Sequence, residues 1–402
     1  MLHLLRAQYS SMERTGHQDG TLERLLAADA RPILLHGPAG CGKTAAVLEL
    51  YRRCAPAGEI PSAWLLVPNA VTARAMTARV LEETPSGVLL APQILTFADL
   101  AKRILDSTGK PLRKLNALRR RLLLQRIVRE LHTGGELCSL ASAADTPGLI
   151  SALQRNISEL KRATADPDEL ARRVGAPAGA GADILTIYQR YQQSLNDANA
   201  CDAEGQAWLA RDILQDNPDT PLQDLNLTGL RTLIVDGFTD FTPTQLEILA
   251  LLRPRLEQLV ITLPLPAEDD PRDRLWQWTQ RTRTRLQETI GNDLHEIPIS
   301  PHWQGNLTDC IFQYDATCRR PANLHVIAAP GIEAEVQEVG RQIKKLLLSE
   351  RPGRVAVLAR SLGPYRAVIE RIFTQMQIPV RPAEIRLTEV PVLRFCFFVV
   401  DI

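Results

Sequence analysis

The chain has 402 residues, of which 45% are hydrophobic and 23% are charged, and its formal net charge at pH 7 is +1. This length allows two or three domains with their own cores, and the composition is that of an ordinary soluble globular protein. The charge balance alone neither requires nor excludes nucleic acid, because local clustering of basic residues decides such binding.

The seven cysteines include no C-x-x-C pair, so we expect reduced thiols and no structural metal in a cytoplasmic protein. Residues 1–20 lack the apolar stretch and the small-residue cleavage site of a signal peptide. No window reaches the roughly 18 apolar residues that a membrane span requires, so we expect no membrane partner.

After a predicted tail at residues 1–21, short apolar runs alternate with helical patterns. Runs at 32–36 and 63–67 predict strands, and a third short run at 87–90, also a predicted strand, leads into residues 93–97. Patterns at 45–53, 71–83 and 98–107 predict the helices that follow. Such alternation favours a parallel sheet that is covered by helices on both faces.

The pattern changes from about residue 115. Apolar residues then recur at three- and four-residue steps, as in Leu118, Leu122 and Ile127, with no convincing strand. We therefore predict a helical insertion at residues 116–209.

Strand and helix signals return after the insertion. Strands are predicted at 232–236 and 259–263, with a helix at 243–252 between them. The first α/β domain is thus predicted to comprise residues 22–115 and 210–320.

A second α/β unit is predicted at residues 321–402. Its elements are strands at 324–327 and 355–358 and helices at 333–348 and 365–375. The most apolar tract, 390–402, is typical of a core element that has just begun. We therefore expect an incomplete second domain and a chain that is a fragment of a longer protein.

A phosphate loop is the clearest motif. The segment Gly37-Pro38-Ala39-Gly40-Cys41-Gly42-Lys43-Thr44 fits the pattern G-x-x-x-x-G-K-[ST]. Glycines let backbone N–H groups approach phosphate oxygens, and the following helix directs its positive end at the same anion. Lys43 is expected to reach the β- and γ-phosphates, and the Thr44 hydroxyl is expected to bind Mg²⁺. This context predicts a site for ATP and Mg²⁺ in a RecA-like α/β domain.

A second Mg²⁺ ligand, acting through water, is expected at the end of a neighbouring strand. Asp236 follows the apolar run 232–235 and fits this role, although a strand-end residue in a turn has the same pattern. Hydrolytic motors usually carry a glutamate next, which activates the attacking water, but Gly237 stands here. Asp240 or Glu247 would replace it only if the backbone returned to the γ-phosphate. The site is therefore predicted to hold ATP better than it hydrolyses it.

Several segments together resemble superfamily 1 DNA helicases. They are the phosphate loop, LVPN at 66–69, LTFADL at 95–100, VDGF at 235–238 with FTP at 241–243, and VAVLAR at 355–360. The DGF…FTP arrangement is similar to that of the AddB subunit of the bacterial AddAB helicase–nuclease. The resemblance runs from about residue 30 to the end, and its discriminating parts are DGF…FTP and residues 353–382.

The resemblance implies roles for further residues. Thr96 and Phe97 match a helicase segment that lies along single-stranded DNA. Arg366 follows Arg360 by six residues, which is the family's spacing for an arginine at the γ-phosphate; a solvated helix residue is the alternative. Full-length AddB-like members continue into more of the motor fold and a nuclease domain with an iron–sulfur cluster, and we expect neither that cluster nor nuclease activity in these residues.

Basic residues gather at the start of the predicted insertion. The stretch 102–131 contains ten lysines and arginines and two carboxylates. Because such clusters neutralise phosphates and release counterions, Arg119, Arg120 and Arg121 are candidate DNA contacts; a solvated helical face is the alternative. Phe97 is the preferred aromatic residue for stacking on a base, with a core position as the alternative.

These features predict an ATP- and DNA-binding subunit of a helicase–nuclease complex that processes DNA double-strand breaks for recombinational repair. The resemblance implies a partner subunit of the AddA type, which would drive translocation while ATP in this chain stabilises or signals a conformation. Two alternatives stay open. One is an active superfamily 1 helicase whose catalytic base comes from elsewhere, and the other is a noncatalytic scaffold with a vestigial ATP site.

Overall fold

The computed structural model describes residues 2–6, 22–25, 32–55, 59–84, 87–109, 112–174, 179–266, 270, 272–291, 293–299, 325–349 and 355–380. The chain divides into two compact units, of which the larger spans residues 16–317. The smaller unit combines residues 1–15 with residues 318–402.

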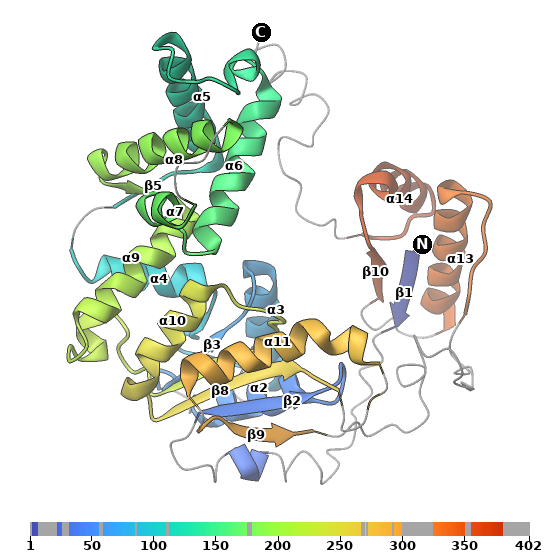
Figure 1. Cartoon of the computed structure of the whole chain (residues 1–402). Helices are drawn as coiled ribbons and strands as arrows, with labels where there is room; N and C mark the ends of the chain where they lie inside the picture. The colour runs from blue at the N-terminus through green and yellow to red at the C-terminus, as the bar shows by residue number, and fades with distance from the viewer. Residues whose placement is uncertain are drawn as a thin grey trace. The chain divides into compact units, whose positions relative to one another are not determined.

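A six-stranded sheet forms the centre of the larger unit (Figure 1). In spatial order its strands are β4 (Ile94–Leu95), β3 (Ala63–Leu66), β7 (Thr232–Val235), β8 (Gln258–Pro264), β2 (Ile33–Gly37) and β9 (His295–Pro298). All neighbouring strands are parallel, which confirms the predicted α/β class. Because β8 alone separates β2 from β7, the loops that follow β2 and β7 open close together at one edge of the sheet.

Helices cover both faces of this sheet. One face packs against α2 (Lys43–Arg53) and α3 (Ala70–Glu83), and the other against α4 (Phe97–Asp106), α9 (Ala203–Asp216), α10 (Pro243–Leu252) and α11 (Asp273–Ile290). Side chains of β3 point alternately to the two faces. Ala63 and Leu65 pack on the face covered by α2 and α3, and Trp64 and Leu66 pack on the opposite face. Both faces of β3 are therefore buried, as a strand with a continuous apolar run requires.

One predicted strand is wrong. Residues 87–90 form no strand, and Val88 and Leu90 are 58% and 46% exposed. The edge strand is β4, whose Ile94 and Leu95 pair with Leu65 and Leu66 of β3. Residues 87–90 and 94–95 are both short and apolar, and what distinguishes them is that 94–95 pair with β3.

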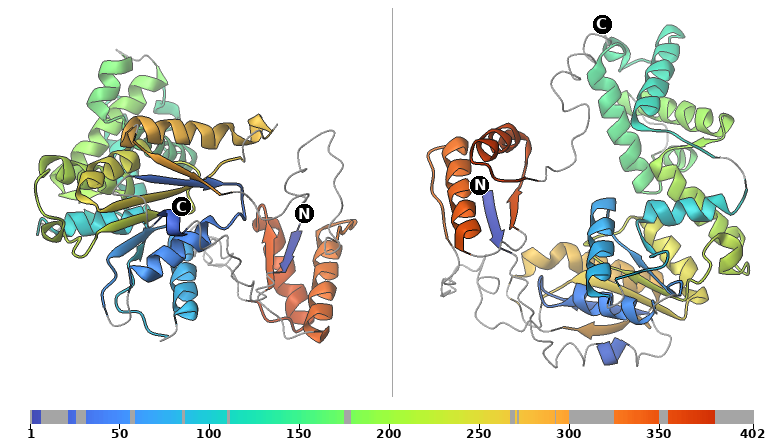
Figure 2. Two further views of the ribbon diagram at one scale, coloured as in Figure 1. Left: turned by 90° about the horizontal axis from the view of Figure 1, so that it is seen from below. Right: turned by 180° about the vertical axis from the view of Figure 1, so that it is seen from behind.

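The helical insertion is a group of four helices that α4 and α9 join to the sheet (Figure 2). Its helices are α5 (Ala117–Thr133), α6 (Pro147–Arg162), α7 (Pro167–Val174) and α8 (Ala180–Asp197). They share a core of their own, which includes Leu124, Ile157 and Tyr188. Two short strands, β5 (Arg113–Lys114) and β6 (Ala200–Cys201), pair in parallel where the chain enters and leaves this group.

The buried face of α5 differs from the one that the sequence indicated. Leu118 and Leu122 were expected on the apolar face, but they are 57% and 54% exposed. The buried face consists of Leu124, Ile127, Val128 and Leu131. Apolar residues thus lie on two sides of this helix, and periodicity alone does not say which side meets the core.

The described residues of the smaller unit form a two-stranded antiparallel sheet and two helices. Strand β1 (Leu2–Arg6) pairs with β10 (Val355–Ala359), so the predicted N-terminal tail contains a strand. Helices α13 (Ile332–Ser349) and α14 (Gly363–Gln375) share an apolar core that includes Val339 and Ile372. Residues 325–327 do not form the predicted strand, and residues 324 and 390–402 lie outside the described ranges.

Candidate nucleotide site

The phosphate loop joins the end of β2 to the start of α2, as predicted. Gly42 occupies the position before the helix with φ of 102°, which is in the left-handed region. Because glycine has no side chain, it cannot cap the helix, and the first turn of α2 contains no acidic residue. The backbone N–H groups at this end therefore favour an anionic ligand.

Close packing explains the first glycine of the loop. A Cβ atom on Gly37 would lie 2.5 Å from the carbonyl oxygen of Ile299 and 2.7 Å from the Cys41 sulfur. Any larger residue would therefore displace the backbone beside β9. Sequence reasoning assigned this glycine to phosphate approach, whereas its immediate neighbour in the structure is another backbone segment.

Lys43 folds over the loop. Its Nζ donates hydrogen bonds to the carbonyl oxygens of Gly37 and Pro38, at 2.7 and 2.8 Å. The ammonium group is thus held against the loop. In this position it would meet the outer phosphates of a nucleotide bound by the loop N–H groups.

Thr44 and Asp236 meet although 192 residues separate them in the sequence. The Thr44 hydroxyl donates to Asp236 Oδ2 at 2.9 Å, and Thr262 on β8 donates to Asp236 Oδ1 at 2.6 Å. Asp236 is only 3% exposed. A hydroxyl and a carboxylate oxygen in this arrangement suit Mg²⁺, which prefers oxygen ligands.

Thr262 is a site residue that the sequence analysis missed. It is 2% exposed and lies in the strand that separates β2 from β7. The sequence does single out this residue, because Thr262 is the one polar residue in the apolar run 259–263. A hydroxyl inside such a run requires a hydrogen-bond partner, and Asp236 provides it.

The residue after Asp236 cannot easily be the glutamate of a hydrolytic motor. Gly237 has φ of 85°, a backbone conformation that side chains other than glycine rarely adopt. A Cβ atom there would lie 3.4 Å from Cδ of Pro68, an ordinary van der Waals distance, so the constraint is the backbone conformation and not a lack of space. The backbone conformation at Gly237 therefore disfavours a catalytic glutamate at this position.

The two carboxylates considered as substitutes have other partners. Asp240 accepts hydrogen bonds from Arg285 at 3.0 Å and from Thr282 at 3.3 Å, both on α11. Glu247 accepts one from Arg211 of α9 at 3.1 Å. Asp240 thus joins the loop after β7 to α11, and Glu247 joins α10 to α9.

A Gly237→Glu variant should therefore gain no ATPase activity and should be less stable by about 1–3 kcal/mol, because a side chain is forced into a left-handed conformation. Urea denaturation and steady-state ATP turnover would measure both effects. Gly148→Glu is a suitable control, because nothing lies within 4 Å of a Cβ at this position. A stable variant with increased turnover would contradict the structural explanation.

The two residues expected along single-stranded DNA take structural positions. Thr96 caps α4, with its hydroxyl 2.7 Å from Asp99 Oδ2 and accepting from the Asp99 N–H at 3.2 Å. Phe97 is 8% exposed, and its ring packs edge-on against Phe238 and Phe241 at centroid distances of 5.4 and 6.4 Å. The core alternative thus holds for Phe97 in this conformation, while a DNA contact by Thr96 stays a prediction.

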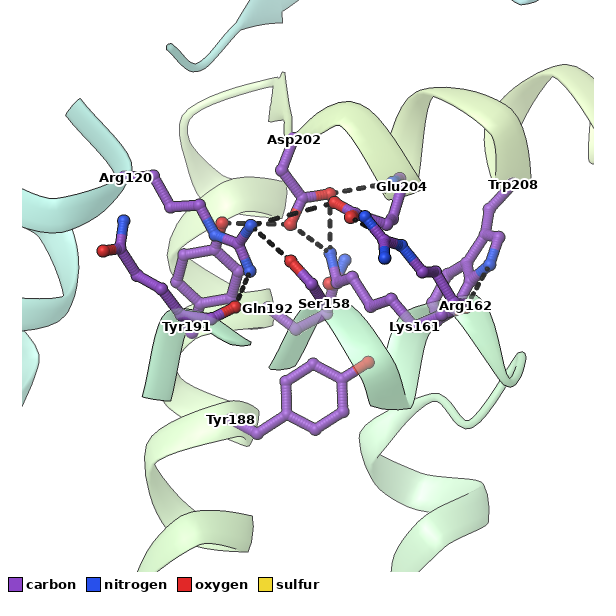
Figure 3. A network of polar contacts seen from close by, with 12 residues as sticks. Arg120, Ser158, Lys161, Arg162, Tyr188, Tyr191, Gln192, Asp202, Glu204 and Trp208 are labelled. Atoms are coloured by element: carbon purple, nitrogen blue, oxygen red, sulfur yellow. Dashed lines mark hydrogen bonds and ion pairs between the residues drawn. The ribbon is translucent and has the colours of Figure 1, made fainter. Parts of the chain in front are cut away.

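Arg120 is not a surface arginine, contrary to its assignment as a DNA contact. Its guanidinium donates to Ser158 Oγ at 2.7 Å and to the Gln154 carbonyl at 3.0 Å, and its side chain is 13% exposed. Figure 3 shows it beside a buried polar network. Arg119 is exposed and Arg121 half-buried, so DNA contacts by these two arginines stay predictions.

The centre of this network is a fully buried ion pair. Lys161 Nζ lies 2.9 Å from Asp202 Oδ2, and the two side chains are 0% and 1% exposed. Asp202 also caps α9, accepting from the Gly205 N–H at 2.7 Å, and Tyr191 donates to it at 3.0 Å. Burial by itself would raise the pKa of the Asp202 carboxyl, but the Lys161 ammonium, the Gly205 N–H and the Arg120 guanidinium hold it below its usual value.

The network extends through α9 to the domain that contains the six-stranded sheet. Gln206, one turn after the Asp202 cap, donates from Nε2 to the carbonyl oxygen of Ala98 at 3.0 Å. Ala98 directly follows Phe97 in the first turn of α4. Helix α9, which Asp202 caps, is thus bonded to the segment that lies beside the DGF…FTP turn.

Arg366, the predicted γ-phosphate sensor, belongs to the smaller unit. It lies in α14, and its Nε is 3.7 Å from Glu370 Oε1. Its assignment to the nucleotide stays a prediction. None of the helices in the described part of the chain combines the length and apolar character required of a membrane-spanning helix.

The larger unit therefore has a RecA-like α/β architecture, with a glycine loop after one strand and a buried carboxylate after a nearby strand. Residues 34–306 match the family described as ADDB, N-terminal. Since the match covers more than half of the chain, the chain belongs to this family.

Curated relatives are each named as the B subunit of an ATP-dependent helicase/deoxyribonuclease. The one from Alkaliphilus metalliredigens is 24% identical over 370 residues, which cover 86% of this chain and 31% of the relative. The one from Bacillus subtilis is 26% identical over 299 residues, covering 64% and 24%. The one from Desulforudis audaxviator is 28% identical over 371 residues, covering 85% and 31%. The chain thus spans less than a third of the length of these relatives.

Proposed function

We propose that this chain is the nucleotide-binding part of a subunit in a helicase–nuclease complex that processes DNA double-strand breaks for recombinational repair. In this proposal the site binds ATP with Mg²⁺ and hydrolyses it slowly or not at all. The observation that carries the proposal is the buried contact of Thr44 and Asp236 beside Gly237, whose backbone conformation disfavours a catalytic glutamate.

Each residue of the site has a distinct task. The loop from Gly37 to Gly42 presents N–H groups to phosphate oxygens, and Lys43 neutralises charge on the outer phosphates. Thr44 and Asp236 would hold Mg²⁺, the latter through water, and Thr262 orients the Asp236 carboxylate. When bound, Mg²⁺ neutralises charge on the phosphates and orients them. Lacking a positioned base, the site is suited to a role in which ATP stabilises one conformation.

DNA and a partner subunit complete the proposal. The names of the relatives describe a helicase and deoxyribonuclease subunit, which supports a protein partner and DNA as the substrate. An AddA-type subunit is the partner we propose, and it would provide the translocating motor. The stretch 102–131, which is rich in basic residues, supports a contact with the DNA backbone.

Calorimetric titration of the full-length protein with ATP tests the nucleotide site. An Asp236→Asn variant should bind ATP about tenfold more weakly in Mg²⁺ and equally well in EDTA, since it loses one charged interaction with the hydrated cation. Asp224→Asn, at an exposed position, is the matched control. Equal loss in EDTA would show that Asp236 acts on the fold of the site and not on the metal.

Turnover measurements separate the proposal from its alternatives. DNA-stimulated hydrolysis by the isolated subunit should stay below about 1 s⁻¹, the lower end of ordinary enzymes. Faster turnover would favour an active helicase. If ATP raised neither the melting temperature nor the affinity for DNA, the site would be vestigial, because a ligand of the native state must stabilise it.

A further inference from the structure

The outward side of α5 carries leucines where a solvated helix would carry polar residues. Leu118 and Leu122 are more than half exposed, and the buried residues Leu124, Ile127, Val128 and Leu131 lie on the opposite side. With 3.6 residues per turn, a spacing of four residues aligns the two leucines along the helix axis. Arg129 continues the same line and Arg126 lies next to it, and both are exposed. We call these four residues the outward stripe.

The charges around the leucines are predominantly positive. Arg119 is exposed beside Leu118, and Arg126 lies 3.6 Å from the exposed Glu130. Arg120, on the inner side, is committed to Ser158 and the Gln154 carbonyl and adds nothing to this surface. The stripe therefore combines a small apolar centre with a basic rim, which is the residue pattern of protein interfaces.

A DNA backbone explains the arginines but not the leucines. Phosphates remain hydrated or pair with cations, and an apolar side chain placed against them gains nothing. A protein surface with apolar side chains between carboxylates would bury both leucines and pair with the arginines. The composition of the stripe thus favours a protein over a nucleic acid.

We propose that the outward stripe of α5 is a contact surface for the AddA-type partner subunit, which would meet it with apolar side chains flanked by carboxylates. This inference rests on the proposed function, because it takes the partner from there. In this inference the arginines near Leu118 and Leu122 contact an acidic protein surface instead of DNA.

The test uses the full-length protein and the AddA-type subunit from the same genome. Leu118→Ser with Leu122→Ser should weaken the complex by at least about tenfold, measured by interferometry, because truncated central interface residues typically cost that much. Leu81→Ser with Leu90→Ser is the matched control, since these leucines are 39% and 46% exposed on another part of the domain. Arg119→Glu with Arg129→Glu should weaken the same complex and reduce its dependence on salt.

Four results would overturn the inference. An unchanged affinity of the Leu118 and Leu122 variant, or an equal loss in the control, would show that the stripe is not the contact. A loss of DNA affinity in the absence of the partner would assign the surface to nucleic acid. A melting temperature lowered by more than about 4 °C in the isolated subunit would mean that its own chain covers the stripe.

The proposed function fails in a different way. If the wild-type subunit does not bind the AddA-type subunit at all, both the proposed partnership and the inference about α5 are wrong. If the wild-type and the Leu118 and Leu122 variant bind it equally, the partnership holds and only the surface is wrong.

Discussion

A Lys43→Ala variant is expected to bind ATP at least about 100-fold more weakly than the wild-type protein, because charge-assisted hydrogen bonds contribute about 1.5–3 kcal/mol each and a lysine over the loop can make two. Its Nζ already lies 2.7 and 2.8 Å from loop carbonyls, so the ammonium needs little rearrangement to reach an anion in the loop. Calorimetric titration with ATP and Mg²⁺ would measure the loss.

The same substitution should leave the fold nearly unchanged. The buried Gly37 carbonyl also accepts from the Leu265 N–H at 3.2 Å, and the carbonyl of the half-buried Pro38 can accept from water in place of the lysine. Thermal unfolding without ATP should therefore give a similar midpoint, while the increase caused by ATP disappears. Lys102→Ala, an exposed lysine on α4, is the control. Retained ATP affinity in Lys43→Ala would exclude this loop as the principal phosphate site.

Lys161→Met is expected to destabilise the larger unit by about 3–5 kcal/mol, because removing one partner leaves the other charge buried and uncompensated. Asp202 is 1% exposed, and it also caps α9, so its carboxylate cannot turn to solvent without uncapping that helix. Urea denaturation would measure the loss of stability.

A double-mutant cycle distinguishes pairing from packing. Lys161→Met combined with Asp202→Asn should cost less than the sum of the single changes, because no isolated charge is left. Arg162→Met is the matched control, since its side chain is 62% exposed and its nearest carboxylate, that of Glu204, is 3.5 Å away. The control should change stability by at most about 0.5 kcal/mol. If Lys161→Met lowered the free energy of unfolding by less than about 1 kcal/mol, the ion pair with Asp202 would not be a main source of stability.

The features predicted well from the sequence depend on local patterns. The phosphate loop is a contiguous motif, and its strand-before, helix-after context follows from periodicity over about twenty residues. Asp236 could be proposed because an apolar run leads directly to it. The turn at Gly237 could be identified as lacking a base, but not as a left-handed position that disfavours one.

The features that were missed depend on contacts between distant segments. Strand β1 pairs with β10, about 350 positions further along the chain, and five residues without a nearby partner carry little signal. Phe97 and Arg120 have the residue types of DNA contacts, yet tertiary packing places one ring against Phe238 and one guanidinium against Ser158. Residue type alone does not distinguish a functional arginine from a structural one.

The parallel pairing of β5 with β6 bears on how such a protein can change over evolution. Arg113 lies opposite Ala200 and Lys114 opposite Cys201, so 85 residues leave the main fold and return at adjacent points. A segment with neighbouring ends can be lengthened, shortened or exchanged while the sheet keeps its strand order, as domain insertions do. The four helices can therefore diverge as a module, and their contacts can be altered without rebuilding the loop between β2 and α2.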